Sequence, residues 1–314
     1  MKTYASTIRE QYMSKNFETI ATESRQLLGQ IDPQAKPLNP LSSHSGIDRS
    51  SQVGFDPKQL LPKPTYVEAG VEKLTRLCDA LGMNHKTAEA IEIFRAMTLS
   101  WGDRKIQDNA GWQSNVSDDG APFEFSIAFE DDRAELRILL EAQGSEPNLQ
   151  SNWEAGLILN QYLAERYHVS LDRFKQIEDL FVPTNPDAKF SIWYSVCLSP
   201  DKDPSFKIYL NPQAQGESRA AATIEESLVR LNFPRAWSKL AEIGAKRGPE
   251  QDEFAYFSLD LASHSEARVK IYLRHYDMTV DALEEVLSLA QNYVAGDAAE
   301  FCKALTPQIG RAHV

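Results

Sequence analysis

The chain has 314 residues, of which 42% are hydrophobic and 25% charged, so it can build a sizeable globular core. Its 33 basic and 45 acidic residues give a net charge of -12, which argues against binding to nucleic acid through phosphate contacts. No apolar run approaches the length of a membrane span, and the N-terminus is too polar for a secretory signal, so we expect a cytoplasmic protein with no membrane contact.

Residues 1–64 are predicted to lie apart from the main domain. A polar amphipathic helix is expected over 3–31, and the sequence after it is rich in Pro, Ser, Gly and Asp without an apolar period. That composition is typical of a linker. Two helices are then predicted, one over 65–82 and a second from about Asn84 to Trp101.

Three pairs of strands follow, separated by helical sequence. The loop within each pair is short, which favours an antiparallel hairpin over a parallel βαβ unit. A unit of helix, two strands and helix therefore repeats along 65–305, which predicts one α+β domain. The expected strand pairs are 122–130 with 134–143, 189–200 with 205–212, and 253–262 with 267–276, and the expected helices are 148–167, 223–246 with a break at Pro234, and 279–294.

Side chains alternate between the two faces of a strand, and one face of each pair is polar. Lysine and tyrosine two residues apart recur on that face, at Lys207 with Tyr209 and at Lys270 with Tyr272. Further members of the polar faces are Glu124, Arg137, Trp193 and Arg268. The simple interpretation is a solvated face of an α+β sandwich. If the sheet instead closes into a barrel with helices outside, these groups line a lumen suited to a diphosphate ester that ionises to a carbocation.

Five segments carry a family resemblance that is specific as a set. They are WGDRKI (101–106), SDDGAPFEFSIAFE (117–130), LRILLEAQG (136–144), FKIYLNPQAQG (206–216) and ARVKIYLRHYDMT (267–279). Together they resemble the ABBA aromatic prenyltransferases, most closely the bacterial indole branch of hapalindole-type and dimethylallyltryptophan synthase-like enzymes. The resemblance implies an antiparallel β-barrel of αββα repeats with helices outside.

The resemblance also implies a reaction and a set of site residues. A dimethylallyl or geranyl group passes from its allylic diphosphate to an indole-containing small molecule by electrophilic aromatic substitution. Glu124 matches the base that accepts the indole N–H proton, and Tyr209 and Tyr272 match the residues that shield the allyl cation. The implied diphosphate-binding residues are Arg137, Lys207, Arg268 and Lys270. Trp193 is a candidate wall for the acceptor, with ordinary core packing as the alternative.

No obligatory cofactor or protein-bound metal is expected. Asp118 and Asp119 do not form the aspartate-rich box of isoprenyl synthases, so a helix N-cap or a turn before the strand is the expected role. Magnesium can still bind through the diphosphate itself. Cys78, Cys197 and Cys302 lack the spacing of a zinc site or disulfide framework, which predicts reduced, packed thiols.

The C-terminal sequence departs from the family pattern. Six strands are predicted where the family barrel has ten, and the segment 306–314 contains IGRAHV, which reads as a translated sequencing adapter. We therefore expect a barrel that is incomplete at its C-terminus, followed by a non-native tail. The alternative function is a non-catalytic or inactive barrel that binds an amphiphilic or apolar ligand.

Overall fold

The structure is a computed structural model of the chain. It describes residues 63–106, 111–130, 133–248, 250–265, 267–290 and 292–305. The predicted N-terminal helix, most of the linker and the predicted tail at 306–314 lie outside these ranges. The chain divides into two units between Lys63 and Pro64, and the account below concerns the second unit. None of the described helices is long and apolar enough to cross a membrane.

The first predicted helix begins at a capping box. The Thr65 hydroxyl accepts the Glu68 backbone N–H, and the Glu68 carboxylate accepts the Thr65 N–H, so helix α2 spans Tyr66–Ala80. Its successor α3 covers Thr87–Met97 and is shorter than predicted. The chain leaves the helix after Met97 because the Trp101 ring is buried against the sheet, where it stacks on Phe123 at 6.3 Å.

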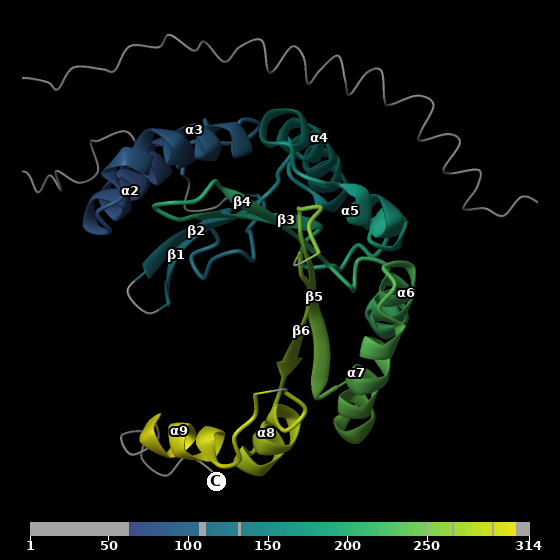
Figure 1. Ribbon diagram of the computed structural model, residues 1–314. Helices are drawn as coiled ribbons and strands as arrows, with labels where there is room; N and C mark the ends of the chain where they lie inside the picture. Colours follow the sequence, from purple (N-terminus) through teal and green to yellow (C-terminus); the bar gives the residue numbers. More distant parts are fainter. Residues whose placement is uncertain are drawn as a thin grey trace, which may run out of the picture. The chain divides into compact units, whose positions relative to one another are not determined.

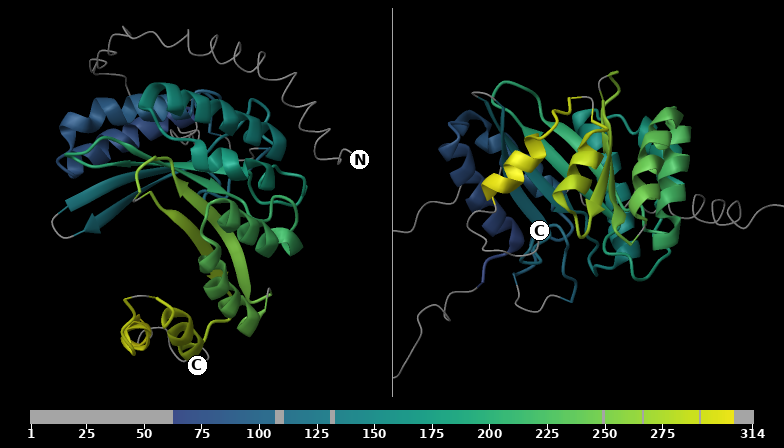
Figure 2. Two further views of the ribbon diagram at one scale, coloured as in Figure 1. Left: turned by 45° about the vertical axis from the view of Figure 1, so that its right-hand side comes forward. Right: turned by 90° about the horizontal axis from the view of Figure 1, so that it is seen from below.

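All six described strands form one antiparallel sheet in chain order. They are β1 (Phe123–Glu130), β2 (Arg133–Glu141), β3 (Ile192–Leu198), β4 (Ser205–Leu210), β5 (Asp252–Asp260) and β6 (Val269–His275). Every strand pairs with the next, so β1 and β6 are the edges of the described sheet. The sheet is curled, as two views show (Figures 1 and 2). The predicted hairpins and their antiparallel sense are confirmed.

The remaining helices follow the predicted order, with three differences. They are α4 (Leu149–Tyr167), α5 (Asp172–Ile177), α6 (Ala220–Arg230), α7 (Pro234–Arg247), α8 (Val280–Leu287) and α9 (Asp297–Leu305). Helices α5 and α9 were not predicted, and the helix expected over 279–294 ends at Leu287. The Glu284 carboxylate accepts the backbone N–H groups of Gly296 and Ala299, which holds a turn and the start of α9 where a longer helix was expected.

Helices α2 to α7 lie on the outer side of the curled sheet (Figure 1). The apolar faces of the strands pack there, with Ile208 and Leu210 fully buried as predicted. Helix α4 approaches β3 so closely that a Cβ on Gly156 would lie 2.5 Å from Ile192. Phe129, predicted on the same apolar face, is instead 75% exposed at the end of edge strand β1. The alternate residues of each strand form the inner face, opposite these helices.

Candidate functional site

The four predicted diphosphate-binding cations lie on neighbouring positions of the inner face. Lys207 on β4 is opposite Asp260 on β5, and Lys270 on β6 is opposite Ser258, two residues from Asp260. The pKa of Lys270 is lowered by burial, then by the positive charges of Arg268 and Lys207, with a further contribution from Arg137. These positive charges therefore act on one another across the inner face, and we call Arg137, Lys207, Arg268 and Lys270 the cation cluster.

Two carboxylates partly neutralise the cation cluster. Asp260 accepts hydrogen bonds from the backbone N–H and Nε of Arg268 at 3.0 and 2.9 Å, and Glu135 accepts from Arg137 Nε at 2.7 Å. Burial acts to raise the pKa of each carboxyl, but the arginine hydrogen bonds and charges outweigh it and the pKa is lowered. Four cations thus face two carboxylates, and an excess of positive charge remains for an anion.

A buried thiol lies beside the most deeply placed cation. Lys207 is only 8% exposed, and its Nζ donates to the Sγ of Cys197 at 3.1 Å. Cys197 is free and buried, as predicted, but the sequence analysis gave it no place near the site. The thiol is a weak acceptor, so a phosphate oxygen would be a stronger partner for the same ammonium group.

Aromatic side chains adjoin the cation cluster. Tyr209 and Tyr272, the predicted cation-shielding pair, have ring centroids 5.9 Å apart. Burial, followed by the neighbouring Tyr209, raises the pKa of Tyr272 to about 12, so its phenol is neutral at physiological pH. Tyr256, which the sequence analysis missed, meets Tyr272 edge to face at 5.9 Å. The tyrosines therefore extend from the cations along the inner face.

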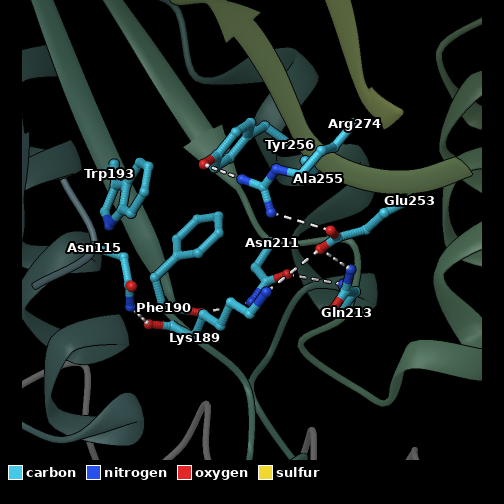
Figure 3. A pocket seen from close by; sticks show the side chains of 10 residues that line it. All are labelled: Asn115, Lys189, Phe190, Trp193, Asn211, Gln213, Glu253, Ala255, Tyr256 and Arg274. Carbon is cyan, nitrogen blue, oxygen red and sulfur yellow. Dashed lines mark hydrogen bonds and ion pairs between the residues drawn. The ribbon is translucent and has the colours of Figure 1, made fainter. Parts of the chain in front are cut away.

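Beyond the tyrosines is a pocket of about 190 Å³ (Figure 3). Trp193 lines it and is 3% exposed, stacked on Phe190 at 4.2 Å and lying 5.3 Å from Tyr256. Trp193 therefore packs in a small apolar cluster and also lines the pocket, and its role as a wall for the acceptor stays a prediction. The lining residues are Asn115, Lys189, Phe190, Trp193, Asn211, Gln213, Glu253, Ala255, Tyr256 and Arg274.

One end of this pocket is polar (Figure 3). Glu253 accepts hydrogen bonds from Arg274 at 3.0 Å and Gln213 at 2.7 Å, and the Lys189 ammonium lies 3.8 Å from it. Burial opposes ionisation of Glu253, yet hydrogen bonds from Tyr276 and Gln213 and the nearby cations lower its pKa. Charges of both signs are thus present beside an aromatic wall.

The predicted base, Glu124, is exposed on the inner face of β1. It is opposite Leu139, and the same row continues through Ser195 to Lys207 on β4. Three strand spacings separate Glu124 from Lys207, or about 14 Å along the sheet. The two residues are therefore not in contact, and the separation leaves room for a ring system between them.

The turn before β1 has the role predicted for the paired aspartates. Asp119 accepts the Ala121 backbone N–H at 3.0 Å and a hydrogen bond from the Ser117 hydroxyl. These bonds lower the pKa of Asp119, that from Ser117 most. Within the described ranges, no three or more His, Cys, Asp or Glu side chains gather as a metal site would require.

Comparison with known protein families assigns the chain to one of them. Residues 68–306 match the family described as tryptophan dimethylallyltransferase. The chain belongs to this family. The predicted resemblance to indole prenyltransferases is thereby confirmed, together with the predicted class of enzyme. The roles of the cations and tyrosines on the inner face stay predictions.

Solved structures agree in fold. The chain is 31% identical to 6-dimethylallyltryptophan synthase from Micromonospora olivasterospora in complex with DMASPP and Trp, with a TM-score of 0.71, covering 76% of this chain and 68% of that one. It is 30% identical to prenyltransferase PriB in a ternary complex with L-tryptophan and dimethylallyl thiolodiphosphate, with a TM-score of 0.68 and coverage of 80% and 70%. AnaPT from Neosartorya fischeri, at 14% identity and a TM-score of 0.62, shares the fold, with coverage of 79% and 71%.

Proposed function

We propose that this protein transfers the dimethylallyl group of dimethylallyl diphosphate to the indole ring of tryptophan or a tryptophan-like small molecule. The observation that carries the proposal is the proximity of three kinds of group on the inner face. Lys207 and Lys270 are each followed two residues on by a tyrosine of the same face, and Tyr209 lies directly opposite Trp193, which lines the pocket. These groups correspond to the parts of the reaction: a diphosphate, an allyl cation and an aromatic acceptor.

In the first step the allylic C–O bond breaks and its electron pair leaves with the diphosphate. The cation cluster stabilises the negative charge that develops on the departing oxygen, most effectively where water is excluded. The buried Lys207 is the best placed of the four for this role. The faces of Tyr209 and Tyr272 stabilise the allyl cation, each by about 1 to 2 kcal/mol.

In the second step a ring carbon of the indole attacks the allyl cation and forms the new C–C bond. A hydrogen bond from the indole N–H to Glu124 increases the electron density of the ring as the bond forms, and the N–H proton passes to the carboxylate to leave a neutral, dearomatised intermediate. Loss of the proton on the alkylated ring carbon to water then restores aromaticity, and Glu124 returns its proton to the indole nitrogen. Exposure of Glu124 on the inner face makes it accessible to an acceptor seated there.

The polar end of the pocket favours an acceptor with an amino acid head group. The Glu253 carboxylate complements an ammonium group, and Arg274 and Lys189 complement a carboxylate. An indole without such a group would leave these charges to pair only with one another. We therefore propose free tryptophan as a better acceptor than indole, with no obligatory cofactor, with magnesium entering only on the diphosphate, and with a cytoplasmic location.

The test is turnover with a matched panel. L-Tryptophan, tryptamine, indole-3-propionate and indole are each incubated with dimethylallyl or geranyl diphosphate, and products are identified by mass spectrometry. We expect a gain of one dimethylallyl group on L-tryptophan, and weaker conversion of the three analogues that lack one or both head-group charges. Tight binding of donor and acceptor without product from any pair would instead support the non-catalytic binding protein.

A further inference from the structure

A buried carboxylate on the inner face of the sheet has no role in the mechanism above. Glu141, at the end of β2, is fully buried. It pairs across the sheet with Trp193, the wall of the pocket. Burial raises the pKa of Glu141, and the hydrogen bonds that it accepts oppose that effect. A buried carboxyl is costly unless its oxygens have partners, so the identity of those partners is informative.

Two of the partners are indole N–H groups. Trp112 Nε1 donates to Oε2 of Glu141 at 2.8 Å, and Trp193 Nε1 donates to Oε1 at 3.4 Å. Gln143 Nε2 donates to Oε2 at 2.8 Å, and the Ser114 hydroxyl also bonds to the carboxyl. These four donors are all neutral. Because indole N–H groups only donate, Glu141 fixes both rings in orientations that an amide or apolar side chain would not specify.

Trp193 lines the acceptor pocket itself, and Trp112 belongs to a segment that contributes Asn115 to the lining. Trp193 comes from β3, whereas Trp112 comes from the segment 111–122 that precedes β1. In that segment Val116 packs in one apolar cluster with Phe190 and Trp193. Asn115, which lines the pocket, donates to the Lys189 carbonyl at 2.9 Å. Glu141 thus bonds both to the segment 111–122, through Trp112, and to Trp193 in the pocket lining, from its position at the end of β2.

We propose that Glu141 is a positioning residue for the aromatic acceptor, holding Trp112 and Trp193 by their indole N–H groups so that two walls of the pocket keep one spacing. The inference rests on the proposed function for the identity of the acceptor. Glu141 is separated from the cation cluster, because Arg137 lies four residues away along β2 and Lys270 lies four strands away across the sheet. Its loss should therefore affect acceptor binding and leave donor binding intact.

The first measurement is independent of activity. The protein has five tryptophans, so ¹⁵N labelling of the indole nitrogens gives five N–H signals. We expect Glu141→Gln to shift the signals of Trp112 and Trp193 and to leave Trp101, Trp153 and Trp237 in place. The amide turns an NH2 donor toward one indole N–H and offers the other a neutral oxygen in place of a carboxylate oxygen. Unmoved Trp112 and Trp193 signals in a folded Glu141→Gln variant would overturn the proposal.

The second measurement separates positioning from stability. With L-tryptophan and dimethylallyl diphosphate, Glu141→Gln should raise KM for tryptophan about tenfold, the effect of roughly one lost hydrogen bond, and leave KM for the donor unchanged. Tyr194→Phe is the matched control: it removes buried hydrogen bonds to Gly156 and Asn160 on the outer face of the same strand as Trp193. It should lower stability without changing KM for tryptophan.

A second variant covers the case in which Glu141→Gln does not fold. Trp193→Phe keeps an aromatic ring but lacks the N–H, so it should by itself reproduce the rise in KM. Where Glu141→Gln also folds, the two effects should not add. Equal KM values in Trp193→Phe and wild type would overturn the proposal. Failure of wild type to alkylate any indole would refute the proposed function instead, and the indole signals would still report whether Glu141 holds the two rings.

Discussion

Replacement of Lys207 tests the donor site most sharply. Lys207 is 8% exposed, whereas the side chains of Arg137 and Arg268 are 45% and 56% exposed and already paired with Glu135 and Asp260. Methionine keeps most of the aliphatic stem of Lys207 and removes the ammonium group. The expected loss is therefore electrostatic, with little change in packing.

The size of the loss follows from the burial of the contact. A hydrogen bond between charged groups contributes about 1.5 to 3 kcal/mol, which corresponds to a rise of roughly 10- to 150-fold in Kd. Binding of inorganic diphosphate, measured by isothermal titration calorimetry, reports this directly without any turnover. Wild-type affinity should also weaken as salt is added, because the Debye length shortens to about 3 Å at 1 M.

A control substitution on the same hairpin measures how much the loss of one positive charge, away from the cation cluster, weakens diphosphate binding. Lys202 is exposed in the loop between β3 and β4, so Lys202→Met removes the same charge away from the cation cluster. We expect it to bind diphosphate within about twofold of wild type. If Lys207→Met and Lys202→Met are both folded and bind diphosphate equally well, Lys207 does not contact the donor, and the reasoning from burial fails.

Three further results are expected. Glu124→Gln should retain diphosphate binding and lose turnover by roughly 10²-fold in the mass-spectrometric assay, the usual scale for a positioned base; unchanged turnover would remove Glu124 from the mechanism. Lys270→Met should stabilise the unliganded protein by about 0.5 to 1 kcal/mol in denaturant titration, because burial and then the neighbouring cations lower the pKa of Lys270 and so disfavour its charged form; a less stable variant would contradict this. The pKa of Asp260 is lowered in the folded protein, so its ion pair with Arg268 contributes its full stability at pH values above the ordinary aspartate pKa of about 3.9. That stability is lost as the pH falls through the lower pKa of the folded protein. Wild type should therefore lose more stability than Asp260→Asn between about pH 5 and 3.

Local periodicity was sufficient to predict the sheet and part of its inner face. Alternation along Phe206–Leu210 correctly separates the apolar outer face from the polar inner face, because the pleat has a period of two whatever the tertiary context. The capping residues of α2 and α4 likewise marked helix starts. Helix α8 ended early because Glu284 bonds to backbone groups beyond it, a contact that no local pattern encodes.

The counter-charges of the site were harder to predict. Asp260 meets Lys207 only through the register between β4 and β5, which depends on the whole sheet. A face-by-face division of β5 would have placed Tyr256 and Asp260 on the same face, since they lie four positions apart and side chains alternate along a strand. The proximity of Cys197 to Lys207 and of Trp112 to Glu141 depends on tertiary packing alone.

The central claim is that the inner face of the sheet binds the donor and the acceptor side by side. A crystal structure of this chain with dimethylallyl thiolodiphosphate and L-tryptophan tests it most directly. We expect the diphosphate against Lys207, Arg268 and Lys270, and the indole beside Trp193 with its N–H directed to Glu124. Diphosphate bound away from the cation cluster, or an indole seated outside the pocket, would contradict the account.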